Sequence, residues 1–213
     1  MISAMPLEQL QIVLAWMLPP LAYLLGSIPF GVIIARRFAA VDIRSGGSGN
    51  IGATNVMRLA GVIPGLLTLA ADILKGTVPV LLARILLPAA GELYVSVTVL
   101  AAVCGHMFSI YHRFRGGKGV ATTAGAFLAV APTAVLIAAA GFALAAGLSR
   151  RVSPGSLLAA ALLVPATGWV THSTAYTLCA LAAAVLIALR HRSNIARLIR
   201  GCEPPFRAGK QKR

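Results

Sequence analysis

Acidic residues are scarce in this sequence, and their scarcity limits the chemistry open to it. Five aspartates and glutamates stand against 19 lysines and arginines among 213 residues, and the formal net charge is +14. The acids are spread along the chain, at Glu8, Asp42, Asp72, Glu92 and Glu203. Magnesium and calcium sites gather several carboxylate oxygens around one ion. We therefore expect no metal ion, and we exclude a metal-dependent phosphatidyl transferase.

Charge of either sign is also rare. Only 11% of residues are charged and 58% are hydrophobic, whereas a soluble domain usually has about 25% charged residues. This composition predicts an all-α polytopic membrane protein with a single integral-membrane domain over residues 1–203. A basic cytoplasmic tail follows at 204–213, which we expect to be disordered. The positive-inside rule and anionic lipid account for the basic excess. We expect no nucleic-acid partner, because no soluble basic face is available.

Cysteine is the third scarce residue, with only Cys104, Cys179 and Cys202. An odd number at wide spacing excludes a disulfide framework and a metal knuckle. The N-terminal region also lacks a basic segment before its first apolar run, since the first arginine is Arg36. We therefore expect a retained first span and not a cleaved signal peptide.

The apolar runs predict seven crossings. One crossing each is expected from 11–35, 59–88, 92–112, 154–170 and 174–189. The run 119–148 has basic residues at both ends, and as one helix it would reach about 45 Å, too far for a hydrocarbon core of ~30 Å. Pro132 predicts a break, so we expect two short helices that go out and return. The positive-inside rule then places the N-terminus outside and the C-terminus in the cytoplasm.

Asp72, Lys75 and His106 are ionisable residues within the apolar runs that could belong to a site. Asp72 and Lys75 lie three positions apart, so they share one helical face. They are either a mutually neutralising pair, or part of a site or of the residues that support one, because ions within the membrane are expensive. His106 is either a second-shell residue or a histidine that packs between helices.

The stretch Gly46–Arg58, GGSGNIGATNVMR, is neither apolar nor periodic. Its four glycines allow backbone N–H groups to converge on one point. Its side chains are hydrogen-bond donors, and it contains no carboxylate. The chemistry favours an anion such as a phosphate, although loops between helices often have a similar composition.

Two further polar clusters are expected at the same cytoplasmic face, FRGGKGVATT at 114–123 and HRSN at 191–194. Arg58 can bind a phosphate with two parallel hydrogen bonds, and Lys118 supplies a point charge before a helix start. The convergence of three clusters favours a site over three unrelated loops. The candidate substrate and phosphate ligands are Gly47, Ser48, Gly49, Asn50, Thr54, Asn55, Arg58, Gly116, Gly117, Lys118, Gly119, His191 and Asn194.

Several familiar motifs are missing. RGGKG is not a Walker A loop, because His112 stands in place of its first glycine and Gly119 follows the lysine. No histidine has an acidic residue five positions later, as in many glycerolipid acyltransferases, and no Gly-x-Ser-x-Gly elbow occurs.

These residues carry a resemblance to a known family. GSIPFG, GGSGNIGATNVMR, the D-x-x-KG at 72–76, GHMFSIYHRFRGGKGVAT and HRSNIARLIRG follow in order between Gly26 and about Glu203. The sequence resembles the bacterial acyl-phosphate-dependent glycerol-3-phosphate acyltransferases, the PlsY family. The resemblance implies transfer of a fatty acyl group from acyl phosphate to the sn-1 hydroxyl of glycerol 3-phosphate. The products would be 1-acyl-glycerol 3-phosphate and phosphate, in the first step of phospholipid synthesis.

The resemblance also carries expectations about place and site. It implies a protein of the bacterial inner membrane whose site faces the cytoplasm, with neither acyl-CoA nor metal, and we expect no cofactor. It casts five residues as catalytic ligands of substrate and phosphate: Ser48, Arg58, Lys118, His191 and Asn194. The general base stays open between His191, His106, Asp72 and a phosphate oxygen of the substrate.

Two other functions have to be weighed. A transporter for a phosphate ester also uses broken helices, but its site lies near the midplane, and all three clusters here are expected at one face. A non-catalytic lipid-binding subunit would explain the basic tail but not the glycine clusters. The sequence leaves acyl-chain preference and oligomeric state open.

Overall fold

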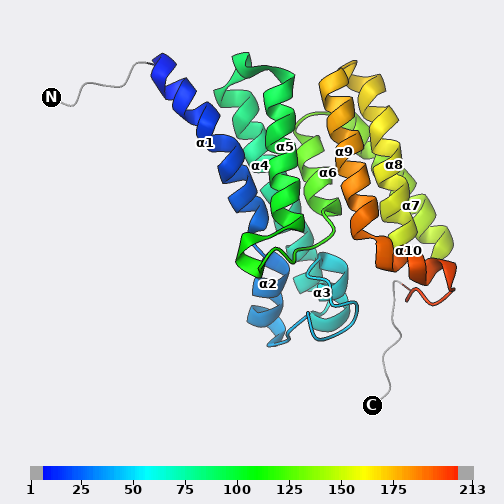
Figure 1. Cartoon of the computed structure of the whole chain (residues 1–213). Helices are drawn as coiled ribbons and strands as arrows, with labels where there is room; N and C mark the ends of the chain where they lie inside the picture. Colours follow the sequence, from blue (N-terminus) through cyan, green and yellow to red (C-terminus); the bar gives the residue numbers. More distant parts are fainter. Residues whose placement is uncertain (1–6, 206–213) are drawn as a thin grey trace.

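The computed structural model describes residues 7–205, and within this range the chain forms helices and no strand (Figure 1). The predicted basic tail at 204–213 lies outside the described residues except for Pro204 and Pro205. The α-helices are α1 (Leu7–Ser27), α2 (Phe30–Ala39), α3 (Ala53–Ala60), α4 (Val62–Leu86), α5 (Gly91–Met107), α6 (Val120–Leu128), α7 (Pro132–Ser149), α8 (Val152–Thr171), α9 (Thr174–Arg190) and α10 (Arg192–Ile199), with short 3-10 helices η1 (Pro88–Ala90) and η2 (Ile110–His112).

Within residues 7–205, five helical stretches are long and apolar enough to cross a membrane. They are Gln11–Ala39, Val62–Leu86, Pro88–His112, Pro132–Ser149 and Val152–Thr171, and α9 with α10, bent by 59°, makes a sixth if counted as one span. The prediction of an all-α protein with several spans is confirmed. The count of seven and the orientation of the termini stay predictions. The seventh crossing would have to be α6, whose nine residues advance only about 13 Å.

The predicted break in the run 119–148 is present. Helix α6 ends at Leu128 and α7 begins at Pro132, whose ring occupies the first turn, where a missing N–H costs nothing. In Figure 1 α6 rises from the loop that precedes it, and α7 returns toward the lower end beside α8. The run therefore forms two helices that go in opposite directions, separated by the expected break at Pro132.

The topology can be tested at the turn between α7 and α8. We expect a cysteine at Arg150 or Arg151, in a chain whose native cysteines are serines, to resist a membrane-impermeant thiol reagent in intact spheroplasts. It should react once the membrane is permeabilised, because two adjacent arginines favour the cytoplasm. His172→Cys, at the opposite end of α8, is the control that should react without permeabilisation. Labelling of Arg150→Cys in intact spheroplasts would instead support five or six crossings.

Small residues let the central helices approach closely. A Cβ at Gly76 of α4 would overlap the carbonyl oxygen of Thr122, and one at Gly125 of α6 would overlap that of Ile73. The backbones of α4 and α6 therefore meet without intervening side chains, as is common between membrane helices. The largest buried apolar cluster lies between α5, α6, α7, α8 and α9, and includes Phe127 and Ile187.

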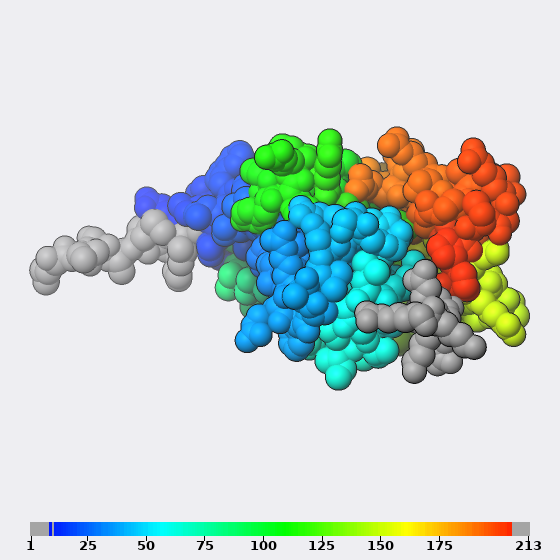
Figure 2. All heavy atoms as spheres, turned by 90° about the horizontal axis from the view of Figure 1, so that it is seen from below, coloured from blue at the N-terminus to red at the C-terminus, as the bar shows by residue number. Residues whose placement is uncertain are grey.

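The three polar clusters meet at the lower end of the helices (Figure 1). The first lies in the loop between α2 and α3 and continues into α3, the second joins η2 to α6, and the third lies at the bend between α9 and α10. Figure 2, which views this end, shows the α2–α3 region beside the α9–α10 region. Helical packing thus brings together segments more than a hundred residues apart in sequence.

Candidate active site

A cavity of about 620 Å³ lies between the three clusters and extends up between the helices. Most of the predicted ligands line it, whereas Gly49, Gly116 and Gly117 do not. Those that do are Gly47, Ser48, Asn50, Thr54, Asn55, Arg58, Lys118, Gly119, His191 and Asn194.

Asn55 shapes the first cluster from within. Its buried carboxamide donates from Nδ2 to the Ile43 carbonyl oxygen at 2.8 Å and accepts at Oδ1 from the Ser48 N–H at 2.9 Å. Gly47 has φ +59°, and a Cβ there would overlap Asn55 Oδ1. Although Asn55 lines the cavity, these bonds already use both ends of its carboxamide, so the structure makes it a support of the loop and not a free ligand.

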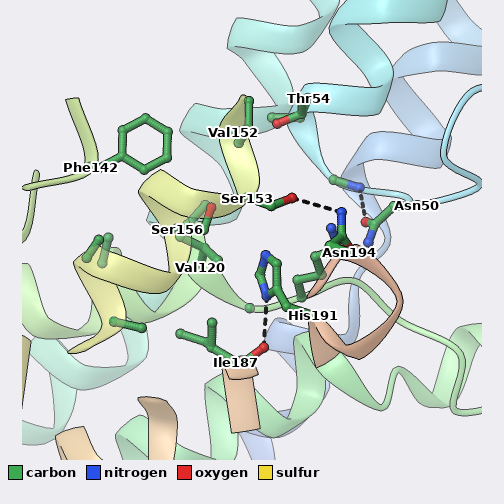
Figure 3. A pocket seen from close by; sticks show the side chains of 18 of the residues that line it. Asn50, Thr54, Val120, Phe142, Val152, Ser153, Ser156, Ile187, His191 and Asn194 are labelled. Carbon is green, nitrogen blue, oxygen red and sulfur yellow. Dashed lines mark hydrogen bonds between the residues drawn. The ribbon is translucent and has the colours of Figure 1, made fainter. Parts of the chain in front are cut away.

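The loop between α2 and α3 also places the N-terminus of α3 at the cavity. Asn50 Oδ1 accepts a hydrogen bond from the N–H of Gly52 at 2.9 Å (Figure 3), and Gly52 is the N-cap of α3. Gly52, Ala53 and Thr54 all line the cavity. A helix N-terminus carries unpaired N–H groups and a partial positive charge. Ser48 and Thr54 add hydroxyl donors beside it.

The glycines of the second cluster hold the loop against α5. The N–H groups of Gly116 and Gly117 donate to the carbonyl oxygens of Met107 and His106, at 3.1 and 3.0 Å. Arg190 donates to the carbonyl oxygens of the same two glycines, at 2.6 and 3.0 Å. The prediction that the amides of Gly116 and Gly117 bind phosphate is not supported, because backbone carbonyls already occupy them. Arg190 was missed, since nothing in its sequence context links it to residues 73 and 74 positions away.

Lys118 and Arg58 are cations of the cavity wall, as is Arg197, which is paired with Glu203. Among residues 7–205, neither Lys118 nor Arg58 lies within 4.0 Å of a carboxylate oxygen. Arg58 Nη2 donates to the Pro205 carbonyl oxygen at 3.3 Å, while its buried Nε has no partner. Burial, together with nearby arginines, lowers the pKa of Lys118 to about 8. Lys118 is therefore still mainly charged at neutral pH, and Arg58 is charged because a guanidinium does not lose its proton in proteins. Both side chains line the cavity and are positioned for an anion.

His191 faces the cavity in a defined tautomer. Its Nδ1 lies 2.8 Å from the Ile187 carbonyl oxygen (Figure 3). A carbonyl oxygen only accepts, so Nδ1 carries the proton and Nε2 keeps its lone pair. Burial, and then the charge of Lys118, lowers the pKa of His191 to about 4. At neutral pH His191 is an uncharged imidazole with a free acceptor.

Asn194 belongs to a hydrogen-bonded group around Glu203. Asn194 Nδ2 donates to Ser153 Oγ at 2.8 Å (Figure 3). Asn194 Nδ2 also donates to Glu203 Oε1 at 2.7 Å, and Ser153 Oγ donates to the same oxygen at 2.6 Å. Arg197 Nε donates to Glu203 Oε2 at 2.7 Å. Burial alone would raise the pKa of Glu203, but these hydrogen bonds bring it below its usual range. Asn194 Oδ1 is buried without a partner.

Sequence reasoning missed Glu203, Ser153 and Ser156 as cavity residues. Glu203 stood out only as one of five scattered acids, yet Gly201, with φ +69°, turns the chain back so that its carboxylate reaches Asn194. The two serines lie three residues apart at the start of α8, and this shared helical face was the one available signal.

Asp72, Lys75 and His106, which were predicted to support a site, form one buried group. Lys75 Nζ lies 2.8 Å from Asp72 Oδ1 and donates to the Ile28 carbonyl oxygen at 3.0 Å, while His106 Nδ1 lies 3.6 Å from Asp72 Oδ1. Asp72 and His106 reach the cavity wall, and Lys75 does not. Since the His106 carbonyl oxygen also accepts from Gly117, this group connects α4, the break between α1 and α2, and the loop that carries Lys118.

Above the polar end the cavity becomes an apolar arm. Its walls come mainly from α4, α7 and α8: Leu69, Ile73, Val135, Ala138, Ala139, Phe142, Ala159, Ala160 and Leu163. Leu69 and Ala139 are exposed as well as cavity-lining, so the arm opens on the outer surface between α4 and α7. In the part of the chain that the structure describes, no three His, Cys, Asp or Glu residues lie together as a metal would require.

Comparison with known proteins gives one family. The sequence profile described as Glycerol-3-phosphate acyltransferase matches residues 16–201. A glycerol-3-phosphate acyltransferase of Anaeromyxobacter dehalogenans (strain 2CP-C) is 49% identical over 185 residues, which cover 85% of this chain and 92% of the relative. One from Pseudomonas paraeruginosa (strain DSM 24068 / PA7) is 46% identical over 194 residues, covering 91% of this chain and 100% of the relative.

Solved structures similar to this chain point to the same family. A crystal structure of PlsY (YgiH), an integral membrane glycerol 3-phosphate acyltransferase, in its glycerol 3-phosphate form matches with a TM-score of 0.86 and 38% identity, covering 91% of this chain and 96% of that one. The lysophosphatidic acid form matches with a TM-score of 0.82 and 37% identity, covering 90% and 94%. The resemblance inferred from the motifs is confirmed, and this chain belongs to the glycerol-3-phosphate acyltransferase family of integral membrane proteins.

Proposed function

We propose that this chain transfers a fatty acyl group from acyl phosphate to the sn-1 hydroxyl of glycerol 3-phosphate. The products are 1-acyl-glycerol 3-phosphate and inorganic phosphate. The observation that carries the proposal is a single cavity that joins a cationic polar end to an apolar arm within the helices. Phosphates fit the first part and a fatty acyl chain fits the second.

The polar end has the donors that two phosphate-bearing substrates require. Arg58 and Lys118 supply charge, Ser48 and Thr54 supply hydroxyls, and the starts of α3 and α6 supply backbone N–H groups. Gly119, with φ +81°, turns the Lys118 loop into α6. We therefore assign the predicted phosphate-binding role to these groups, and a supporting role to Asn55, Gly116 and Gly117.

Of the two predicted roles of Asn194, substrate ligand and phosphate ligand, we propose the first. Both Nδ2 bonds are directed to Ser153 and Glu203, which leaves Oδ1 as the free atom. A carbonyl oxygen accepts hydrogen bonds and would repel a phosphate. Asn194 Oδ1 therefore suits a hydroxyl of glycerol 3-phosphate, and Glu203 fixes the carboxamide in that orientation.

The chemical step needs little from the protein beyond orientation. The attacking hydroxyl forms an ester bond to the acyl carbon, the bond from that carbon to the phosphate oxygen breaks, and phosphate leaves with the electron pair. Acyl phosphate is a mixed anhydride, so positioning and charge stabilisation supply most of the catalysis. We assign the hydroxyl proton to a phosphate oxygen, and His191 Nε2 orients a phosphate OH or substrate hydroxyl.

The proposed location is the bacterial inner membrane, with the cavity opening to the cytoplasm. Support comes from the arginines near the lower end, including Arg36, Arg37, Arg113 and Arg151, since basic residues favour the cytoplasmic side. A transporter would need a path through the molecule, whereas the arm ends among buried apolar residues. This ending favours an enzyme.

One assay tests the proposal. Purified protein with labelled glycerol 3-phosphate should form 1-acyl-glycerol 3-phosphate from palmitoyl phosphate but not from palmitoyl-CoA, and a chelator should not change the rate. An Arg58→Ala, Lys118→Ala double variant serves as the inactive control. Activity with palmitoyl-CoA alone, or activity lost to a chelator and restored by one divalent ion, would refute the proposal.

A further inference from the structure

The apolar arm of the cavity has a measurable depth. On α8 its lining residues run from Val152 at the polar end to Leu163, a distance along the helix of about 16 Å. On α7, which runs the opposite way, Val135 is the lining residue farthest from the polar end. The arm thus reaches about halfway through a hydrocarbon core of ~30 Å.

The far end of the arm is closed. Val135 and Leu163 are both buried, at 8% and 4% exposure. Beyond them Ala131, Ala134 and Ala166 are buried members of the same apolar cluster and do not line the cavity. Filled space at this point leaves no room for further methylene groups, because protein interiors are close-packed.

The walls between the two ends hold small residues. Ala138, Ala159 and Ala160 line the middle of the arm, and no polar side chain lines it between Ser156 and Leu163 on α8. Together with the larger apolar side chains of α4 and α7, these residues form an arm that can hold a straight alkyl chain until the end of that chain meets the far wall. Within this arm the position of that wall decides which chain fits.

We infer that Val135 and Leu163 are specificity-determining residues that set the longest acyl chain the enzyme accepts. The inference rests on the proposed acyl transfer, in which the carboxyl end of the acyl group lies at the cationic end and its methyl end lies at this wall. An acyl chain shorter than the arm leaves space unfilled. A longer one must bend out through the gap between α4 and α7, where Leu69 and Ala139 are exposed.

Internal competition measures this selectivity directly. Wild type, Leu163→Ala and Val135→Ala are given glycerol 3-phosphate and an equimolar mixture of lauroyl, myristoyl, palmitoyl and stearoyl phosphates. The products are counted by mass spectrometry, so that each product ratio reports a ratio of kcat/KM. Leu136→Ala is the matched control, since Leu136 adjoins Val135 on α7, is 67% exposed and does not line the cavity.

We expect Leu163→Ala to raise the product ratio of stearoyl to myristoyl by roughly tenfold or more relative to wild type, the usual effect of one or more methylenes in an apolar pocket. Val135→Ala should shift it the same way by less, and Leu136→Ala should not shift it. If Leu163→Ala does not purify in folded form, the product ratio of Val135→Ala tests the inference by itself.

The outcomes separate the two proposals. No product from any acyl phosphate with wild type would refute the proposed function. If the wild type is active but Leu163→Ala and Val135→Ala have its product ratios, the role of the wall is overturned and the proposed function stands. The same conclusion follows if Leu136→Ala changes the product ratios as much as they do. Equal use of all four acyl phosphates by wild type would show that the acyl chain leaves through the gap, and would also overturn the role of the wall.

Discussion

Replacing Lys118 by alanine is expected to reduce kcat/KM for glycerol 3-phosphate by roughly 10- to 100-fold or more. Lys118 lines the cavity without a carboxylate partner within 4.0 Å among the described residues, so a bound phosphate would be its counterion. A charge-assisted hydrogen bond is worth about 1.5–3 kcal/mol, and each ~1.4 kcal/mol is tenfold. Arg58→Ala should lose a similar amount, and steady-state kinetics with each single and the double variant measures both.

The pH dependence gives this prediction a second readout. With a pKa of about 8, Lys118 loses its charge as pH rises through 8, so kcat/KM should fall on the alkaline side. Lys118→Arg should recover only part of the activity, because a guanidinium differs in shape, but it should move the alkaline limb to higher pH. Arg115→Ala, an exposed residue of the same loop outside the cavity, is the control. Wild-type kinetics in the Arg58→Ala, Lys118→Ala double variant would show that these two residues do not bind a substrate phosphate.

Replacing His191 by asparagine is expected to raise KM while keeping part of the turnover. In the wild type the Nδ1 proton is donated to Ile187, and His191 is neutral above about pH 5, because burial lowers its pKa to about 4. An asparagine can still offer an acceptor and a donor, but not at the same reach. The acidic limb of the pH profile should persist, since it belongs to the second ionisation of the substrate phosphates, near 6.

The alternative makes an opposite prediction for the same variant. If His191 were the general base, its loss would slow acyl transfer by about 10²–10⁴. The limb that titrates with His191, at a pKa of about 4, would also disappear, while the limb near pH 6 from the substrate phosphates would stay. A pH–rate profile of His191→Asn that shows wild-type substrate binding, a thousandfold slower transfer and no limb near pH 4 would therefore show that His191 takes the proton. Single-turnover measurements separate the chemical step from binding.

The sequence by itself determined the class of protein and where its site lies. Apolar runs with few charges specify membrane helices regardless of how those helices pack, and Pro132 marks the break after α6 because a proline ring suits the first turn of a helix. The three polar clusters could be recognised because polar, glycine-rich segments are conspicuous between apolar runs. Their motifs were specific enough to indicate the family.

Only the tertiary structure decided what each residue of the clusters does. Donors in a loop have the same composition whether they face a ligand or a neighbouring carbonyl, so Gly116, Gly117 and Asn55 could not be told from Lys118 by sequence. Glu203 meets Ser153 across 50 residues, a contact that depends on the packing of α8 against the chain after α10. The depth of the apolar arm depends likewise on how α7 and α8 lie together, because a cavity is the space that packed side chains leave unfilled.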